Sequence, residues 1–235
     1  MKDPLRGPRL AWHRMIGSRS VTLDGVTVST DPADVNRTVQ SHLFKGIYEG
    51  PERDILRDLL QPGQRVLEIG TGVGLISLLS TRLTGEGNVT SFEANPALEN
   101  VIRKNYATNG WTPDLRMKAV TSDGAPLRFF STDNILSSSI HDRQLDGKAI
   151  EIESVAMKDA LAEVRPDVIV MDVEGAETQL FAGVDLAGVS HLLIELHPHI
   201  VGQEPIDALI ADLAARGFPM VKTVHKNGLF SRSPA

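Results

Sequence analysis

Short apolar runs alternate along this chain with stretches whose apolar residues recur at helical spacing. Four runs are apolar at nearly successive positions, as buried parallel strands are, and they cover residues 65–69, 89–93, 167–172 and 191–196. Helical spacing before, between and after them predicts helices over residues 51–60, 96–109, 157–164 and 205–216. Because strands that alternate with helices build parallel sheets, the pattern predicts an α/β fold with a seven-stranded, mostly parallel sheet and an antiparallel C-terminal hairpin.

The first 50 residues depart from this alternation. Residues 1–19 are basic and rich in Pro and Gly, which predicts a loose arm, and residues 21–28 alternate around Asp24-Gly25, a two-residue hairpin turn. A helical stretch then opens at Asp31-Pro32. We therefore expect residues 1–50 to form an arm, a hairpin and a helix that cover the site, ahead of the α/β domain over residues 51–235.

Three further segments complete the expected fold. Residues 115–120 read as one strand, and residues 127–155 contain two short strands that predict a small β extension on the sheet. At the end of the chain, two more runs predict a hairpin that turns at Asn227-Gly228.

The stretch 65–75 organises the chain, because a strand there leads through glycines into a helix. Gly70, Thr71, Gly72 and Gly74 form the turn, which lets a ligand approach the backbone closely. This unit is the first part of a Rossmann-like, nucleotide-binding sheet. A dinucleotide fingerprint would place its third glycine at position 75, where the chain has Leu75. The acid that ends the next strand, Glu93, can accept the hydroxyls of a ribose, which predicts a nucleoside ligand without choosing which one.

The amino-acid composition limits the kinds of partner and of chemistry that we expect for this chain. The chain has 235 residues, a net charge of −6 and no cysteine, which argues against a nucleic-acid partner and excludes thiolate chemistry. No apolar run approaches the length of a membrane span, and the N-terminus lacks the apolar core of a secretion signal. We therefore expect a cytoplasmic protein with no membrane partner, and the sequence leaves homo-oligomerisation open.

Polar residues stand at four predicted strand ends. They are Glu68 with the glycine turn, Glu93, Asp172 with Glu174, and Glu195 with His197. The carboxyl ends of parallel strands meet at one edge of a sheet, where ligands bind at the switch point of strand order. We therefore expect these side chains to converge on one site.

The motifs together resemble the FkbM-type family of class I S-adenosylmethionine-dependent methyltransferases. The resemblance covers residues 44–200 and rests on four motifs, namely Gly46-Ile-Tyr-Glu49, Glu68-Ile-Gly-Thr-Gly-Val-Gly74, Asp172-Val-Glu-Gly-Ala-Glu177 and Ile194-Glu-Leu-His-Pro198. It implies the class I methyltransferase fold, S-adenosylmethionine as cofactor, and O-methylation of a hydroxyl on a sugar or natural-product small molecule. Glu68 stands where many members have Asp. The cofactor residues expected from the motifs and the resemblance are Tyr48, Glu49, Glu68, Gly70, Thr71, Gly72, Gly74, Glu93, Asn95 and Asp172.

The expected catalytic residues are Asp172, Glu195 and His197. Methyl transfer from a sulfonium to an alcohol requires that the hydroxyl lose its proton to a base or become acidified by a metal. His197 is a candidate base oriented by Asp172 or Glu195, and the same three residues are candidate ligands of a divalent ion such as Mg²⁺ or Mn²⁺. The sequence leaves these two mechanisms open.

Three other functions are alternatives to this one, and features of the sequence oppose each of them. A nicotinamide-dependent oxidoreductase shares the fold, but Leu75 and the absence of a Tyr-x-x-x-Lys pair oppose it. A methyltransferase-like domain kept only for binding is opposed by the intact glycine turn and acids. An RNA methyltransferase is opposed by the acidic charge balance.

Overall fold

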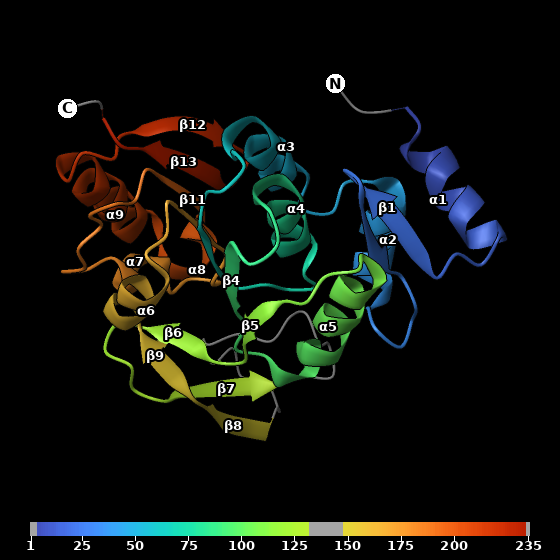
Figure 1. Cartoon of the computed structure of the whole chain (residues 1–235), viewed down its shortest axis with the longest axis horizontal. Coiled ribbons are helices and arrows are strands. Elements are labelled where there is room, and N and C mark those ends of the chain that lie inside the picture. The colour runs from blue at the N-terminus through green and yellow to red at the C-terminus, as the bar shows by residue number, and fades with distance from the viewer. Residues whose placement is uncertain (1–3, 132–147, 234–235) are drawn as a thin grey trace.

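The computed structural model describes residues 4–131 and 148–233, and its core is one seven-stranded sheet (Figure 1). The strand order is β12-β13-β11-β10-β3-β4-β5, and β13 alone runs opposite to the other six strands. This confirms the predicted sheet and its C-terminal hairpin. The strands are β3 (Val66–Ile69), β4 (Val89–Phe92), β5 (Asp114–Arg116), β10 (Val168–Met171), β11 (His191–Glu195), β12 (Met220–Val224) and β13 (Asn227–Ser231).

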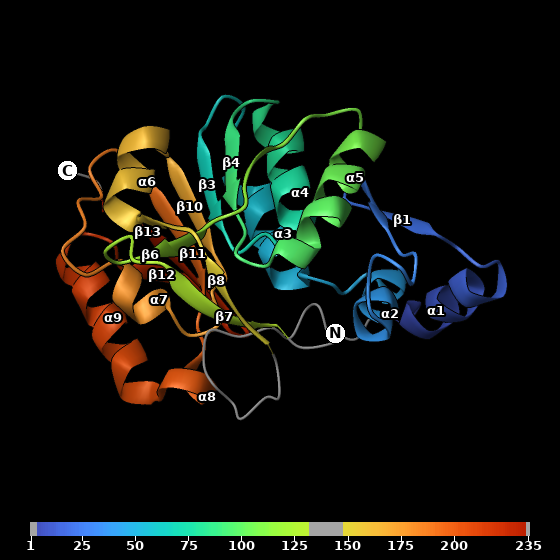
Figure 2. The same cartoon turned by 90° about the horizontal axis from the view of Figure 1, so that it is seen from below.

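Helices cover both faces of the sheet (Figure 2). Successive strand residues point to opposite faces, so Leu67 and Ile69 pack with α6, α7 and α9, whereas Val66 packs with α3 and α4. The strands are therefore apolar on both faces, which is why they read as continuous runs. The helices are α3 (Gly50–Leu59), α4 (Leu75–Thr84), α5 (Glu99–Thr108), α6 (Met157–Val164), α7 (Glu177–Leu180), α8 (Pro198–Val201) and α9 (Gln203–Ala215).

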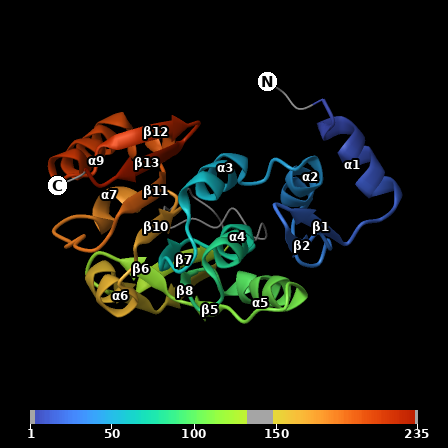
Figure 3. The ribbon, with the colours of Figure 1, turned by 45° about the horizontal axis from the view of Figure 1, so that its top comes forward.

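The N-terminal part packs beside α4 and α5 (Figure 3). The predicted hairpin is present as β1 (Ser20–Leu23) and β2 (Val26–Ser29), and α2 (Arg37–Lys45) follows it. Asn105 and Asn109 of the α5 end accept hydrogen bonds from the backbone N–H groups of β2, at 2.7 and 2.8 Å. The expected loose arm is wrong, because residues Arg6–Met15 form helix α1, which packs against α2.

The predicted strand over residues 115–120 is also wrong. It divides into β5 and β6 (Ala119–Thr121), because the backbone turns at Lys118, whose N–H donates to the carbonyl of Arg116 at 2.9 Å. β6 pairs with β9 (Ser154–Ala156), and β7 (Leu127–Ser131) pairs with β8 (Lys148–Ile152), which confirms the small β extension. The helix expected over residues 96–109 begins as the short 3₁₀ helix η1 (Pro96–Leu98).

The C-terminal hairpin turns two residues earlier than expected. His225 and Lys226 form the turn, and His225 has a φ of 57°. Asn227 and Gly228 already belong to β13, where Asn227 pairs with Glu195. This register buries the Asn227 side chain, whose Nδ2 donates to Glu52 at 2.7 Å.

Candidate active site

The glycine turn lies at the switch point of the sheet. The chain leaves β3 towards β4 on one side, and β10 lies on the other, so a crevice opens at the carboxyl ends of β3 and β10. Gly70 has a φ of 87°, and a Cβ atom there would lie 1.8 Å from the backbone oxygen of Asp172. The close approach of the two strand ends therefore requires glycine at position 70.

Glu93 holds the same turn from the neighbouring strand. Its Oε2 accepts hydrogen bonds from the backbone N–H groups of Thr71 and Gly72, both at 3.0 Å, and its Oε1 accepts one from Asn95 at 2.7 Å. Burial raises the pKa of Glu93, and these N–H groups partly oppose that rise. The acid expected to bind a ribose is thus also an anchor for the glycine turn, a role that the sequence analysis missed.

A cavity of about 630 Å³ opens over this edge of the sheet. Its volume lies in the range of small-molecule sites. Eight of the residues predicted for the site line it, namely Tyr48, Glu49, Gly70, Gly72, Glu93, Asn95, Asp172 and Glu195. Glu174, which the sequence analysis named with Asp172 among the polar strand ends, also contributes to the wall, and so does Glu52, which was not predicted.

Four predicted residues do not line this cavity. Thr71 and Gly74 belong to the turn itself, and His197 is buried behind Asp172 and Glu195. Glu68 is 1% exposed and points beneath the turn, towards the sheet face covered by α4. Burial raises the pKa of Glu68 to about 7, although Ser91 and Thr71 lie close enough to oppose the rise. Glu68 therefore lies outside the cavity wall, and its expected contact with the cofactor stays a prediction.

Arg53 fixes the segment that closes the cavity, and the sequence analysis missed it. Its side chain is buried and donates to the carbonyl oxygens of Tyr48 at 3.0 Å and Gly46 at 2.8 Å. It also pairs with Asp24 in the turn of the N-terminal hairpin. Burial raises the pKa values of Tyr48 and Glu49 well above their ordinary values; Glu49 adds to the rise at Tyr48, whereas the hydrogen bond from Tyr48 partly opposes the rise at Glu49. An Arg within a helical pattern gives no sequence signal for these bonds.

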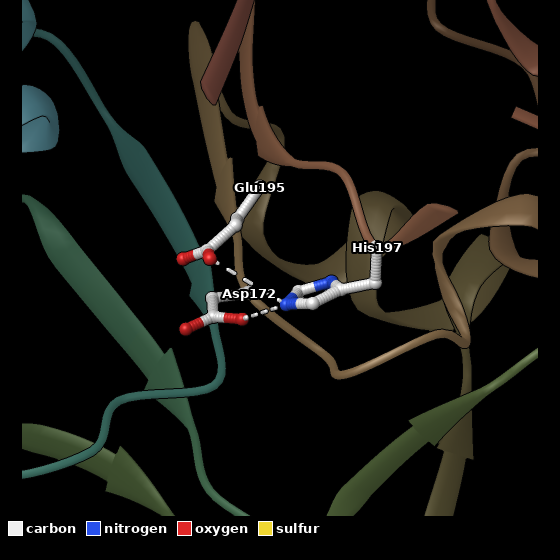
Figure 4. Close-up of side chains that lie close together, drawn as sticks. All are labelled: Asp172, Glu195 and His197. Atoms are coloured by element: carbon white, nitrogen blue, oxygen red, sulfur yellow. Dashed lines mark ion pairs between the residues drawn. The ribbon is translucent and has the colours of Figure 1, made fainter. Parts of the chain in front are cut away.

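Asp172, Glu195 and His197 come together at one end of the cavity (Figure 4). The Nε2 atom of His197 lies 3.6 Å from Oδ1 of Asp172 and 3.6 Å from Oε1 of Glu195. Oε2 of Glu174 is 3.7 Å from the same nitrogen. Parallel pairing of β10 and β11 places these residues at adjacent strand ends, as the positional argument predicts.

Glu177 approaches His197 from the opposite side and holds its backbone. It is fully buried, its Oε1 accepts the backbone N–H of His197 at 2.8 Å, and its Oε2 accepts the N–H of Gly175 at 2.8 Å. The same Oε1 lies 3.4 Å from Nδ1 of His197. Glu177 lies in the first turn of α7, and the sequence analysis missed that its side chain reaches the end of the next strand.

Crowded carboxylates control the charge of this cluster. Burial and the nearby Glu195 raise the pKa of Asp172 to about 8, against the opposing effect of His197. The Asp172 side chain is 47% exposed, but it faces the cavity rather than open solvent. Burial would lower the pKa of His197, yet Glu177 and the surrounding carboxylates raise it above its ordinary value. The arrangement favours any cation that enters, whether a proton, a sulfonium or a metal ion.

This sheet order, with a glycine turn and a ribose-type acid at its switch point, defines a class I S-adenosylmethionine-dependent methyltransferase. A family model described as the methyltransferase FkbM domain matches residues 68–220. The chain therefore belongs to the FkbM methyltransferase family, and its cofactor is S-adenosylmethionine. The nicotinamide-dependent alternative is dropped on this ground.

Partial similarity extends to other methyltransferases. A ribosomal protein L11 methyltransferase of Symbiobacterium thermophilum is 29% identical over 87 residues, which are 37% of this chain and 28% of that protein. A tRNA1(Val) (adenine(37)-N6)-methyltransferase of Shewanella sediminis is 37% identical over 59 residues, 25% of this chain and 24% of that protein. The chain thus spans about a quarter of the length of these relatives.

Solved structures with a similar backbone arrangement include an rRNA methylase from Streptococcus thermophilus. It has 9% identity and a TM-score of 0.47, and the match covers 78% of this chain and 95% of that one. TYW2 of M. jannaschii in complex with AdoMet has 13% identity and a TM-score of 0.46, over 91% of this chain and 86% of that one.

Among the described residues, no helix is both long enough and apolar enough to cross a membrane.

Proposed function

We propose that this methyltransferase transfers the methyl group of S-adenosylmethionine to a hydroxyl oxygen of a small molecule, such as a sugar or a natural product. The observation that carries the proposal is the cluster of Asp172, Glu195 and His197 at one end of the cavity, beside the glycine turn. An alcohol must lose its proton to attack the methyl group, and this cluster supplies the groups that can take or displace it.

The cofactor fits along the glycine turn. Gly70 and Gly72 present backbone to the cavity, and Glu93 and Asn95 line it at the end of β4, where a ribose would lie. Tyr48 and Glu49 close the opposite wall. We propose these six residues and Asp172 as cofactor contacts, with Glu68, Thr71 and Gly74 shaping the turn from within.

The charge of the wall supports a small-molecule acceptor. Six acids line the cavity, namely Glu49, Glu52, Glu93, Asp172, Glu174 and Glu195, whereas Lys118 is the single lysine or arginine among its described lining residues. Such a wall offers a polyphosphate backbone little positive charge to bind. Residues 36–49 contribute seven lining residues, which supports the proposal that residues 1–50 form a cover over the site.

The names of the partial relatives provide the competing candidate, a macromolecular acceptor. One is named as a methyltransferase of ribosomal protein and the other of tRNA. Transfer of isotopically labelled methyl from S-adenosylmethionine should therefore be measured against a panel of hydroxylated metabolites, total tRNA and ribosomal protein. We expect label in an O-methyl ether of a small molecule. Label confined to RNA or protein would refute the proposal and leave the family assignment intact.

A further inference from the structure

Three carboxylate oxygens surround Nε2 of His197 at nearly equal distances. They belong to Asp172 and Glu195 at 3.6 Å and to Glu174 at 3.7 Å. An N–H···O hydrogen bond spans about 2.7–3.2 Å, so these contacts are too long for direct bonds. Within the described part of the chain, Nε2 therefore faces three acceptors without a hydrogen-bond partner.

The separations suit a small ion held between these groups. Divalent ions bind nitrogen and oxygen ligands at roughly 2.0–2.2 Å, so neighbouring ligand atoms lie about 3.0–3.5 Å apart around the ion. One ligand atom each from Asp172, Glu195 and His197 all lie within 4.8 Å of one another. The two Nε2–oxygen separations of 3.6 Å are slightly longer than the ligand spacing around such an ion, and the widest pair of the set would have to close further around it.

A second and independent observation comes from the far side of the imidazole. His197 is 1% exposed, and the buried Glu177 faces its Nδ1 at 3.4 Å while fixing its backbone N–H. A histidine that binds a metal typically has a carboxylate on its other ring nitrogen, which sets the tautomer and the direction of the ring. Here that arrangement aims Nε2 at Asp172 and Glu195 (Figure 4).

The local charge is not balanced by the described side chains. Four carboxylates surround one imidazole, and the nearest lysine, Lys226, is exposed with its Nζ 3.7 Å from Oε1 of Glu195. Direct repulsion among these acids is relieved when a divalent cation lies between them.

We propose that Asp172, Glu195 and His197, with Glu174 at the rim and Glu177 as the positioning residue, form a site for one divalent cation. One imidazole among carboxylates favours Mn²⁺ over Ca²⁺, which takes oxygen ligands throughout. This inference rests on the proposed function for its role, because such an ion supplies Lewis acidity towards the acceptor hydroxyl.

Binding of Mn²⁺ to the chelator-treated full chain tests the site directly, without cofactor or acceptor. The electron paramagnetic resonance signal of free Mn²⁺ should fall until one ion is bound per chain. His197→Ala and Glu195→Gln should each weaken Mn²⁺ binding by at least about tenfold, and Glu177→Gln by about 10–100-fold with all ligands retained. His199→Ala is the matched control, because this exposed histidine lies beside His197, with a ring separation of 5.6 Å, and is outside the proposed ligand set.

The outcomes separate the ion from the reaction. No Mn²⁺ uptake by the wild type, or equal uptake by His197→Ala and the near-isosteric Glu195→Gln, would overturn the site. Hydroxyl methylation that persists in chelator would overturn the role of the ion in the reaction and leave the proposed function standing. Mn²⁺ binding by a protein that methylates no hydroxyl would support the site and refute the proposed function.

Discussion

Replacing Gly70 and Gly72 separately by Ala distinguishes structural from ligand-facing glycines in one turn. At position 70 the new Cβ would lie 1.8 Å from a backbone oxygen of Asp172, at a φ of 87°. The left-handed conformation costs a side chain about 1–2 kcal/mol, and overpacking against backbone costs about 1–3 kcal/mol more. We expect Gly70→Ala to lose roughly 2–5 kcal/mol, a large part of a typical stability of about 5–15 kcal/mol.

Gly72→Ala provides the matched comparison. Its φ is 57°, and the nearest atoms to a Cβ are side-chain oxygens, Tyr48 Oη at 3.4 Å and Glu49 Oε1 at 3.7 Å. These are ordinary contacts, so the stability loss should stay near 1 kcal/mol. Because Gly72 lines the cavity, the added methyl should instead weaken S-adenosylmethionine binding by about tenfold, and the larger Gly72→Val should abolish it.

Urea unfolding and calorimetry measure the two effects. With a slope of roughly 2–3 kcal/mol per molar urea, the midpoint of Gly70→Ala should fall by about 1–2 M and that of Gly72→Ala by less than about 0.5 M. A Gly70→Ala variant as stable as the wild type would refute the close approach of the β3 and β10 ends. Unchanged cofactor affinity in Gly72→Ala would remove Gly72 from the ligand surface.

The remaining predictions concern three buried charges. Glu93→Gln should weaken cofactor binding and lower stability by about 1–3 kcal/mol, because it removes a charged acceptor from two N–H groups; unchanged calorimetry and urea midpoints would contradict this. Glu68 has a folded pKa of about 7 against an ordinary 4.5, so its proton is held in the folded state and stability falls as pH rises between these values. Glu68→Gln should not show this loss of stability, which is on the order of 3 kcal/mol. Identical curves of urea midpoint against pH for the wild type and Glu68→Gln would refute the prediction. Arg53→Lys should loosen the cover and reduce cofactor affinity by several-fold, and calorimetry showing wild-type affinity would reject this role.

The features of the fold that depend on local residue spacing could be predicted from the sequence. Continuous apolar runs located the central strands, and the glycine turn and Asp172 fell at the carboxyl ends of neighbours in the sheet. Residues close along one strand end, such as Glu195 and His197, are brought together by the same local rule.

Long-range contacts were missed because they have no periodic signal. Glu177 contacts His197, which is 20 positions away along the chain. Arg53 holds the cover through the carbonyl oxygen of Tyr48 and through Asp24 in the turn of the N-terminal hairpin. The Asn227-Gly228 dipeptide read as a turn because it is a strong local signal, but pairing with β11 placed Asn227 in a strand. Pro and Gly near the N-terminus predicted a loose arm. The segment instead forms helix α1, which packs against α2, a contact that local composition does not reveal.

Single-turnover methyl transfer by Asp172→Asn and His197→Ala tests the central claim most directly, once an acceptor is identified. Both residues belong to the cluster at the end of the cavity, and neither change removes the glycine turn. We predict that each variant slows methyl transfer by about 10²-fold or more, while His197→Ala, which lies outside the proposed cofactor contacts, changes the dissociation constant of S-adenosylmethionine far less. Near-wild-type rates in both variants would contradict the claim that this cluster carries the reaction.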